Sequence, residues 1–209
     1  MEQLAKKIAK SIGESLGKND EEIAVMAYGL IGLLQFLAIF ALASVIGIVF
    51  GFWLEVLTVF LSVGFLRRLT GGAHSSGIYN CLVYSVVFIC SFSAAARYLL
   101  PTLPTNIICV ICALIFAFGY FIIARKAPVA PPNKPCKTEA KRKRLRRGAF
   151  TVISIFLMLV AVSIIFRGSV GRLYSLGLAL ALSTLWQITM MTRAGHTFIK
   201  FIDNLFIKK

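Results

Sequence analysis

A polar stretch separates two long apolar runs of this chain: Arg67-Arg68-Leu69-Thr70-Gly71-Gly72-Ala73-His74-Ser75-Ser76-Gly77-Ile78-Tyr79-Asn80-Cys81. It begins with two arginines, contains three glycines, and holds a histidine and a cysteine that are seven positions apart. In the whole chain 58% of the residues are hydrophobic, whereas soluble domains contain about 45–50%. The composition predicts an integral membrane protein, in which this stretch is the place for polar chemistry.

On the N-terminal side of the stretch, residues 23–66 form an apolar run whose one charged residue is Glu55. A transmembrane helix needs about 20 residues, so this longer run must fold back on itself. Gly47 and Gly51 mark the expected turn, which predicts helices over 23–46 and 48–66. An ionisable residue inside such a helix is a candidate for function, although a position at the lipid headgroups beside Trp53 is the alternative.

On the C-terminal side, four more apolar runs predict helices over 81–100, 106–124, 149–166 and 173–191. A basic, proline-containing segment, 125–147, is expected to be a loop. The sequence therefore predicts an all-α integral membrane protein that forms one membrane domain, 1–209, with six transmembrane helices.

Residues 1–18 have an apolar residue at every fourth position and lysines elsewhere on the helical wheel. The recurring apolar residues are Leu4, Ile8, Ile12 and Leu16. This pattern predicts an amphipathic helix on the membrane surface, with an ordinary soluble helix as the alternative. Asn19 or Asp20 is expected to cap the helix that follows.

The charges predict the orientation of these helices. The chain has 23 Lys and Arg residues against 8 Asp and Glu residues, a formal net charge of +15. With the N-terminus inside, all basic residues except Arg97, Arg167 and Arg172 fall on the cytoplasmic side. Both termini and the 67–80 loop are therefore expected on the cytoplasmic side of the membrane. Because topology accounts for most of the positive charge, we do not expect a nucleic-acid partner.

His74 and Cys81 can form a nucleophilic pair. A thiolate needs a nearby base or positive field, and the start of a helix at Cys81, with Asn80 as its N-cap, favours a negative sulfur. The glycines around His74 let the imidazole fold back over the sulfur. The spacing alone is weak support, because a loop histidine and a membrane-facing cysteine can exist without contact.

We expect no metal site and no cofactor. A zinc site needs three or four ligands, and no second histidine or acid lies close to His74 in the sequence. Cys109 and Cys112 share a helix face, but membrane-buried cysteines usually act as small apolar residues. The five cysteines form no paired framework, so disulfides are not expected either.

Taken together, these residues resemble a known family. Arg67-Arg68, Gly71-Gly72-Ala73-His74, Cys81 and Ser85, placed between the second and third apolar segments, are similar to the signature of the accessory gene regulator B family of membrane cysteine endopeptidases. Ala127-Pro128 and Asn133-Lys134-Pro135 resemble the proline-rich segment that precedes a basic cluster in that family.

The resemblance implies a role in bacterial quorum sensing at the cell membrane. Members bind a small propeptide with an amphipathic leader and an acidic tail, and they remove the tail on the cytoplasmic side. By this resemblance His74 and Cys81 are the catalytic pair, and Arg67, Gly72 and Ser85 have supporting roles. The resemblance also implies a thioester acyl-enzyme, which a cysteine or serine of the peptide is expected to resolve into a cyclic thiolactone or lactone.

Charge suggests where the substrate tail and the membrane bind. The basic residues on the cytoplasmic side suit an acidic tail or anionic lipid headgroups equally well. The tail-binding candidates are Arg68, Lys141, Arg142, Lys143 and Arg144.

Several alternatives remain open from the sequence. Glu55, Asn80 and Ser85 are candidates for a third catalytic residue, and His196 is expected to be a solvated interfacial residue. A small transporter, or a scaffold that docks a partner through the basic loop, is the rival to the endopeptidase. Small residues in the last two helices also permit a homodimer.

Overall fold

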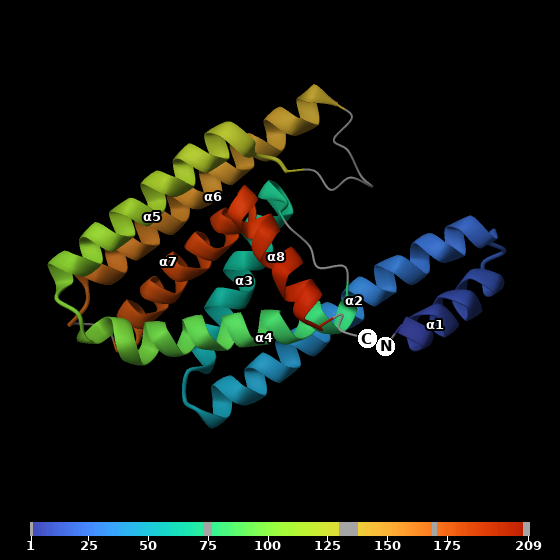
Figure 1. Cartoon of the computed structure of the whole chain (residues 1–209), viewed down its shortest axis with the longest axis horizontal. Coiled ribbons are helices and arrows are strands. Elements are labelled where there is room, and N and C mark those ends of the chain that lie inside the picture. Colours follow the sequence, from blue (N-terminus) through green and yellow to red (C-terminus); the bar gives the residue numbers. More distant parts are fainter. Residues whose placement is uncertain (1, 73–76, 130–137, 169–170, 207–209) are drawn as a thin grey trace.

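The computed structural model describes residues 2–72, 77–129, 138–168 and 171–206, and most of them are helical. In chain order the helices are α1 (Glu2–Ser15), α2 (Asp20–Val49), α3 (Trp53–Thr70), α4 (Ile78–Ala94), α5 (Thr105–Lys126), α6 (Glu139–Ile165), α7 (Leu173–Met190) and α8 (Arg193–Phe206). A π-helical turn, Ala95–Leu99, and a 3-10 turn, Leu100–Thr102, follow α4 (Figure 1). The all-α prediction is confirmed.

Helices α1 and α2 form a hairpin at the N-terminus. The Asn19 side chain accepts a hydrogen bond from the Glu22 amide (2.8 Å), and the Glu22 carboxylate accepts one from the Asn19 amide (3.2 Å). This capping box confirms Asn19 as the cap of α2. Figure 1 shows α1 packed alongside α2. The small residues of α1, Ala5, Ala9 and Gly13, are buried, whereas its apolar stripe is exposed.

The predicted turn between the first two apolar helices is misplaced by a few residues. Helix α2 continues through Gly47 to Val49, and α3 begins at Trp53. Gly51 makes the turn with a φ of 76°, which an L side chain rarely adopts. Gly47 is instead a packing residue, because a Cβ there would lie 3.0 Å from the Trp53 backbone.

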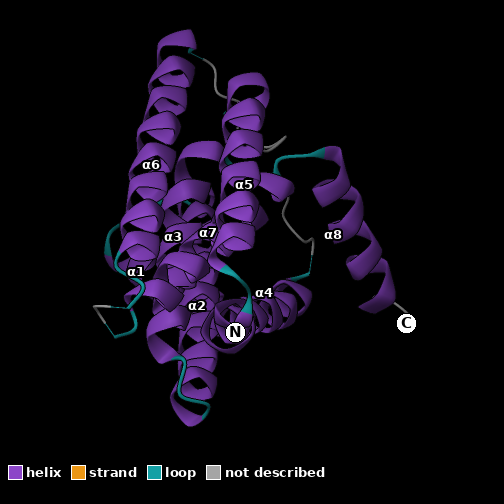
Figure 2. Cartoon of the chain, turned by 90° about the vertical axis from the view of Figure 1, so that its left-hand side faces the viewer, coloured by secondary structure: helices purple, strands orange, loops and turns teal. Residues whose placement is uncertain are grey.

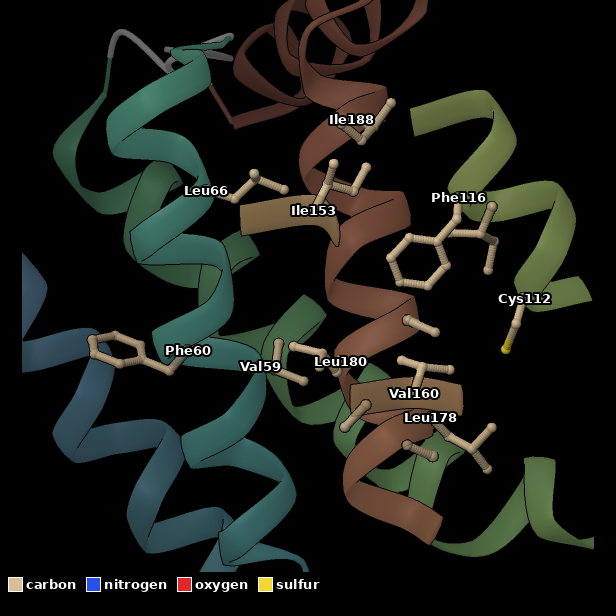
Figure 3. Packing of buried hydrophobic residues seen from close by; sticks show 14 of the residues in the cluster. Val59, Phe60, Leu66, Cys112, Phe116, Ile153, Val160, Leu178, Leu180 and Ile188 are labelled. Carbon is tan, nitrogen blue, oxygen red and sulfur yellow. The ribbon is translucent and has the colours of Figure 1, made fainter. Parts of the chain in front are cut away.

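Helix α7 occupies the centre of the bundle. Its buried residues contact α3, α5 and α6, and Figure 3 shows Leu178 and Ile188 among side chains of those helices. Small residues allow this close approach, since a Cβ at Gly177 would collide with Ser163 of α6. Polar residues on α7 are consequently held at fixed positions within the bundle.

Five of the described helices are long and apolar enough to cross a membrane. They are α2, α4 with its two following turns, α5, α6 and α7. Helix α3 has 18 residues, but it carries Glu55, Arg67 and Arg68. It packs between α2 and α7, so much of its surface is covered by protein.

The basic cluster that follows Glu139 is part of helix α6. Glu139 begins α6, so the positions from Lys141 to Arg147 form its first turns, where a loop was predicted. Figure 2 shows this end of α6 beyond the rest of the bundle, near the end of α5.

The bundle has two ends that are tied by different contacts. At one end, the Gly51 end, Tyr98 donates a hydrogen bond to the Phe50 carbonyl (2.6 Å) and Arg167 donates one to the Pro101 carbonyl (2.8 Å). At the other, the Gly71 end, the Val129 amide donates to the Thr70 carbonyl (2.8 Å). Helix α4 begins at the Gly71 end.

Candidate active site

Cys81 lies in the first turn of α4. Gly77 is the N-cap, and the Cys81 amide donates a hydrogen bond to the Gly77 carbonyl (2.9 Å). The prediction of Asn80 as the cap is wrong, because the helix begins at Ile78 and Asn80 is already helical. Cys81 nevertheless lies near the N-terminus of the helix, as predicted.

His74 lies outside the described residues, but the chain on both sides of it is described. Gly72 precedes it by two positions and Gly77 follows it by three. The sequence-based pairing of His74 with Cys81 therefore stays a prediction.

A glycine corner fixes the start of the segment that carries His74. Gly71 has a φ of 70° and Gly72 a φ of 138°. A Cβ at Gly71 would collide with the Val129 carbonyl, and one at Gly72 would lie 3.4 Å from the Met190 carbonyl. Both the backbone conformation and the packing therefore require glycine at this corner.

Gln187 of α7 holds the same corner from inside the bundle. Its side chain is fully buried, and its Nε2 donates hydrogen bonds to the Gly71 carbonyl (2.7 Å) and to Thr70 Oγ1 (2.9 Å). Thr70 Oγ1 in turn donates to the Leu66 carbonyl (2.8 Å). The corner is thus connected to the most buried helix of the protein.

Tyr84 is the polar neighbour of the cysteine. Its hydroxyl lies 3.4 Å from Cys81 Sγ, one helical turn further along α4, and the tyrosine is buried. A hydroxyl at this distance can donate a hydrogen bond to a thiolate. Cys81 itself is only half-buried, which leaves its sulfur accessible to a substrate.

The surroundings of Cys81 are apolar and involve α8. Tyr84, Met190 and Ile199 form a buried cluster, against which Cys81, Phe88, Trp186 and Ile202 pack. Phe198 of α8 contacts Phe88 with a ring separation of 5.7 Å. Helix α8 therefore covers one side of α4 near the cysteine.

The two arginines of the motif face different surroundings. Arg67 lines a cavity of about 50 Å³ together with Tyr84, Ser85 and Trp186. Arg68 is exposed and lies at a separate apolar groove of about 220 Å³ that Phe36 and Phe60 also line. Arg67 and Ser85 are consequently brought together beside Tyr84, whereas Arg68 is not.

The basic candidates on α6 are separate from this cavity. Lys141, Arg142, Lys143 and Arg144 are exposed on the first turns of the helix, and Lys143 pairs with Glu139 at 2.9 Å. A mobile peptide segment or lipid headgroups can reach them from outside.

Two further candidates from the sequence lie away from the cysteine. Glu55 is fully buried at the Gly51 end, where Ser175 donates a hydrogen bond to it (2.6 Å), and the length of α3 separates it from Cys81. It therefore cannot orient the histidine. His196 is exposed at the start of α8, with its Nδ1 2.9 Å from the Thr192 carbonyl.

Among the described residues, no group of three His, Cys, Asp or Glu side chains is placed to hold a metal ion. Cys112 is buried and Cys109 is exposed, although both lie on α5. Cys136 lies outside the described residues.

The sequence analysis missed Gln187 and Tyr84. Tyr84 has a local signal, because residues three positions apart on a helix are neighbours. Gln187 has no local sequence signal, since its hydrogen-bond partners are more than a hundred residues away in the chain. A lone amide inside an apolar run is the one hint that it must find a partner.

Comparisons with known proteins agree with the motif. Residues 5–191 match the model of the family described as Accessory gene regulator B. A Clostridium perfringens strain SM101 protein described as AgrB-like is 32% identical over 207 residues, which cover 98% of this chain and 97% of the relative.

Two other relatives extend the comparison. A second AgrB-like protein, from C. perfringens strain 13, is 31% identical over 98% of this chain and 97% of its own length. One from Listeria innocua is 31% identical over 66% of this chain and 65% of its own length. No solved structure matches. The chain therefore belongs to the accessory gene regulator B family, which implies a role in the processing of a quorum-sensing peptide.

Proposed function

We propose that the protein is a membrane cysteine endopeptidase that removes the C-terminal tail of an autoinducer propeptide and promotes its cyclisation. Cys81 is the nucleophile and His74 the general base. The observation that carries this proposal is the placement of Cys81 in the first turn of α4, four residues after Gly77, with the glycine corner fixing the other side of the His74 segment.

The first chemical step makes a thioester. His74 takes the thiol proton, Cys81 Sγ attacks the scissile carbonyl, and the carbon–nitrogen bond breaks as the proton passes to the leaving amine. Tyr84, 3.4 Å from the sulfur, stabilises the thiolate by donating its hydroxyl proton into a hydrogen bond. The released tail carries the new amino group.

The second step closes the ring without water. A thiol or hydroxyl of the bound peptide attacks the thioester, and Cys81 leaves as a thiol. Water would give a linear peptide instead, so the site must exclude it. The apolar cluster of Phe88, Trp186 and Ile199 around the cysteine supports this requirement.

The proposed topology has six membrane crossings with the active site in the cytoplasm. At a rise of 1.5 Å per residue, α3 is about 27 Å long, close to the thickness of the hydrocarbon core. The clustering of basic residues at the Gly71 end supports the cytoplasmic assignment of that end and of both termini. The bacterial cell membrane is the compartment that this topology and the family suggest.

The proposed partners follow from charge. Arg68 and the exposed residues from Lys141 to Arg144 attract the acidic tail of the propeptide, and they also favour anionic lipids. The apolar stripe of α1 is available to the membrane. A second copy of the chain, in a homodimer, is the remaining proposed partner.

The test uses the purified protein in proteoliposomes with a synthetic propeptide. Release of the acidic tail and formation of the cyclic product are followed by mass spectrometry. Cys81→Ala and His74→Ala should each abolish both, while Cys136→Ala and Cys109→Ala, the latter at a lipid-facing position, should leave them unchanged. A transporter or scaffold, the rival class, would show no tail release in any variant. Processing that survives both catalytic substitutions would refute the proposal.

A further inference from the structure

A cavity of about 50 Å³ lies between α3, α4 and α7, which contact one another in this part of the bundle. Its polar residues, Arg67, Tyr84 and Ser85, belong to the Gly71 end. The rest of its lining is apolar and comes from all three helices: Val59, Val63, Phe88, Ile89, Phe92 and Trp186. The cavity is therefore an apolar space inside the bundle with one polar edge.

The cavity adjoins Cys81 through Tyr84. The Tyr84 hydroxyl lies 3.4 Å from Cys81 Sγ, and the same side chain lines the cavity. Ser85 and Phe88, four and seven residues after Cys81, share its face of α4 and also line the cavity. Cys81 packs against the same buried cluster as Phe88 and Trp186. A carbonyl group bound at Sγ would therefore have this cavity beside it.

Aromatic packing fixes the walls and the size of the cavity. The Phe88 and Trp186 rings stack with their centroids 4.0 Å apart, and Phe92 meets the Trp186 ring edge-on at 5.8 Å. A cavity that holds a benzene ring has a volume of about 150 Å³. The cavity beside Tyr84 is too small for such a ring, whereas it can hold an aliphatic side chain of up to about three carbon atoms.

We propose that this cavity is the specificity pocket for the residue on the acyl side of the scissile bond, and that it selects a small aliphatic side chain such as that of alanine or valine. This inference rests on the proposed function, since the acyl-side residue is the one whose carbonyl carbon Cys81 attacks. A side chain that fills the pocket holds this carbonyl at Sγ. A larger side chain stays outside the pocket and keeps the carbonyl away from the sulfur.

The first measurement is kcat/KM in proteoliposomes for propeptides that differ only at the acyl-side residue, with alanine, valine, leucine or phenylalanine there. The wild type should process the alanine and valine peptides about 30-fold or more faster than the phenylalanine peptide. Val63→Ala enlarges the pocket and should raise kcat/KM for leucine relative to alanine about tenfold. Val63→Leu fills the pocket and should lower kcat/KM for valine relative to alanine about tenfold.

Val87→Ala and Val87→Leu are the matched controls. Val87 is also a valine of this part of the bundle, but it is exposed and does not line the cavity. Both variants should keep the substrate preference of the wild type.

The second measurement needs no propeptide. The Cys81 thiolate attacks the sulfenyl sulfur of an alkyl methanethiosulfonate, which forms an alkyl disulfide on Cys81 and releases methanesulfinate. Propyl and benzyl reagents are compared at the peptide level by mass spectrometry, with exposed Cys109 as the internal reference. The propyl-to-benzyl rate ratio at Cys81 should exceed the ratio at Cys109 about tenfold, and Val63→Ala should bring the two ratios closer together.

A substrate preference that shifts in opposite directions in Val63→Ala and Val63→Leu, together with the higher ratio at Cys81, would support the pocket. Wild-type rates for the alanine and phenylalanine peptides within about twofold of each other, or equal ratios at Cys81 and Cys109, would overturn it. A wild type that processes no propeptide at all would refute the proposed function. The disulfide rates alone would then decide whether the cavity selects the groups that bind at Cys81.

Discussion

At the scale of single residues, the site depends on a buried amide. Gln187 gives both protons of its Nε2 to the glycine corner, one to Gly71 and one to Thr70. Its Oε1 is also buried and has no hydrogen-bond partner among the described residues. The unpaired Oε1 costs stability, whereas Nε2 holds the backbone of the corner in place. Gln187 therefore contributes more to the geometry of the site than to the stability of the fold.

We predict that Gln187→Met will lower processing more than it lowers stability. The substitution keeps the length of the side chain but leaves the half-buried Gly71 carbonyl and the buried Thr70 hydroxyl without their donor from α7, which costs about 1–3 kcal/mol. Displacement of the His74 segment by even about 1 Å should reduce kcat about 10–100-fold. The measurements are the thermal unfolding midpoint in detergent and the rate of tail release per folded molecule.

Ser183→Ala is the matched control for this prediction. Ser183 lies one turn before Gln187 on α7, is equally buried, and shares a 2.6 Å hydrogen bond with Ser62 of α3. Its loss should lower the unfolding midpoint and leave kcat unchanged. Equal loss of kcat in both variants would mean that general loosening of α7, and not the glycine corner, limits the reaction.

At the scale of helices, α8 is expected to keep water from the thioester. Ile199→Ala removes a buried side chain that packs with Tyr84 and Met190, and it should cost about 2–4 kcal/mol locally. Loosening of α8 should raise the alkylation rate of Cys81 several-fold and increase the share of linear over cyclic peptide. Product ratios from mass spectrometry and alkylation kinetics test this.

Phe201→Ala on the same helix serves as the comparison. Phe201 is 62% exposed and points away from the buried face, so its loss should change neither the product ratio nor the alkylation rate. If Ile199→Ala also left both unchanged, α8 would not be the cover of the site.

The sequence was sufficient for most of the long helices, but it predicted neither α8 nor the contacts between helices. Apolar run length predicted every long helix, and Asn19 was correctly identified as a cap because its capping box is local. The start of α6 was missed because its first turns are charged, and charge was read as a loop although Lys and Arg are good helix formers. Cys81 and the glycines could be found from the motif. Gln187 could not, because its role depends on the packing of α7 against α3.

At the scale of the whole molecule, the two ends of the bundle differ in chemistry. The Gly51 end holds a buried acid and the hydrogen bonds that join α4 to α2 and to the α6–α7 turn. The Gly71 end holds the corner, the cysteine and most of the basic residues. Helix α3 connects the two ends and carries the motif arginines at its C-terminus, so the proposed topology needs α3 to cross the membrane.

We predict that cysteines placed at the two ends of α3 will be labelled from opposite sides of the membrane. Phe50 is exposed just before α3 and Arg68 is exposed near its end. In a background without the native cysteines, Phe50→Cys should react with a membrane-impermeant maleimide in intact cells. Arg68→Cys should react only after permeabilisation, because the proposed topology puts the basic end in the cytoplasm.

Positions beyond α3 provide the internal comparison for that experiment. Gly168→Cys, at the Gly51 end in open space, should label like Phe50→Cys, and Lys141→Cys, on the exposed start of α6, should label like Arg68→Cys. Labelling of Phe50→Cys and Arg68→Cys from the same side would mean that α3 does not cross. The chain would then have five crossings, and Cys81 would face the opposite compartment from Lys18, which would place the active site away from a propeptide made in the cytoplasm.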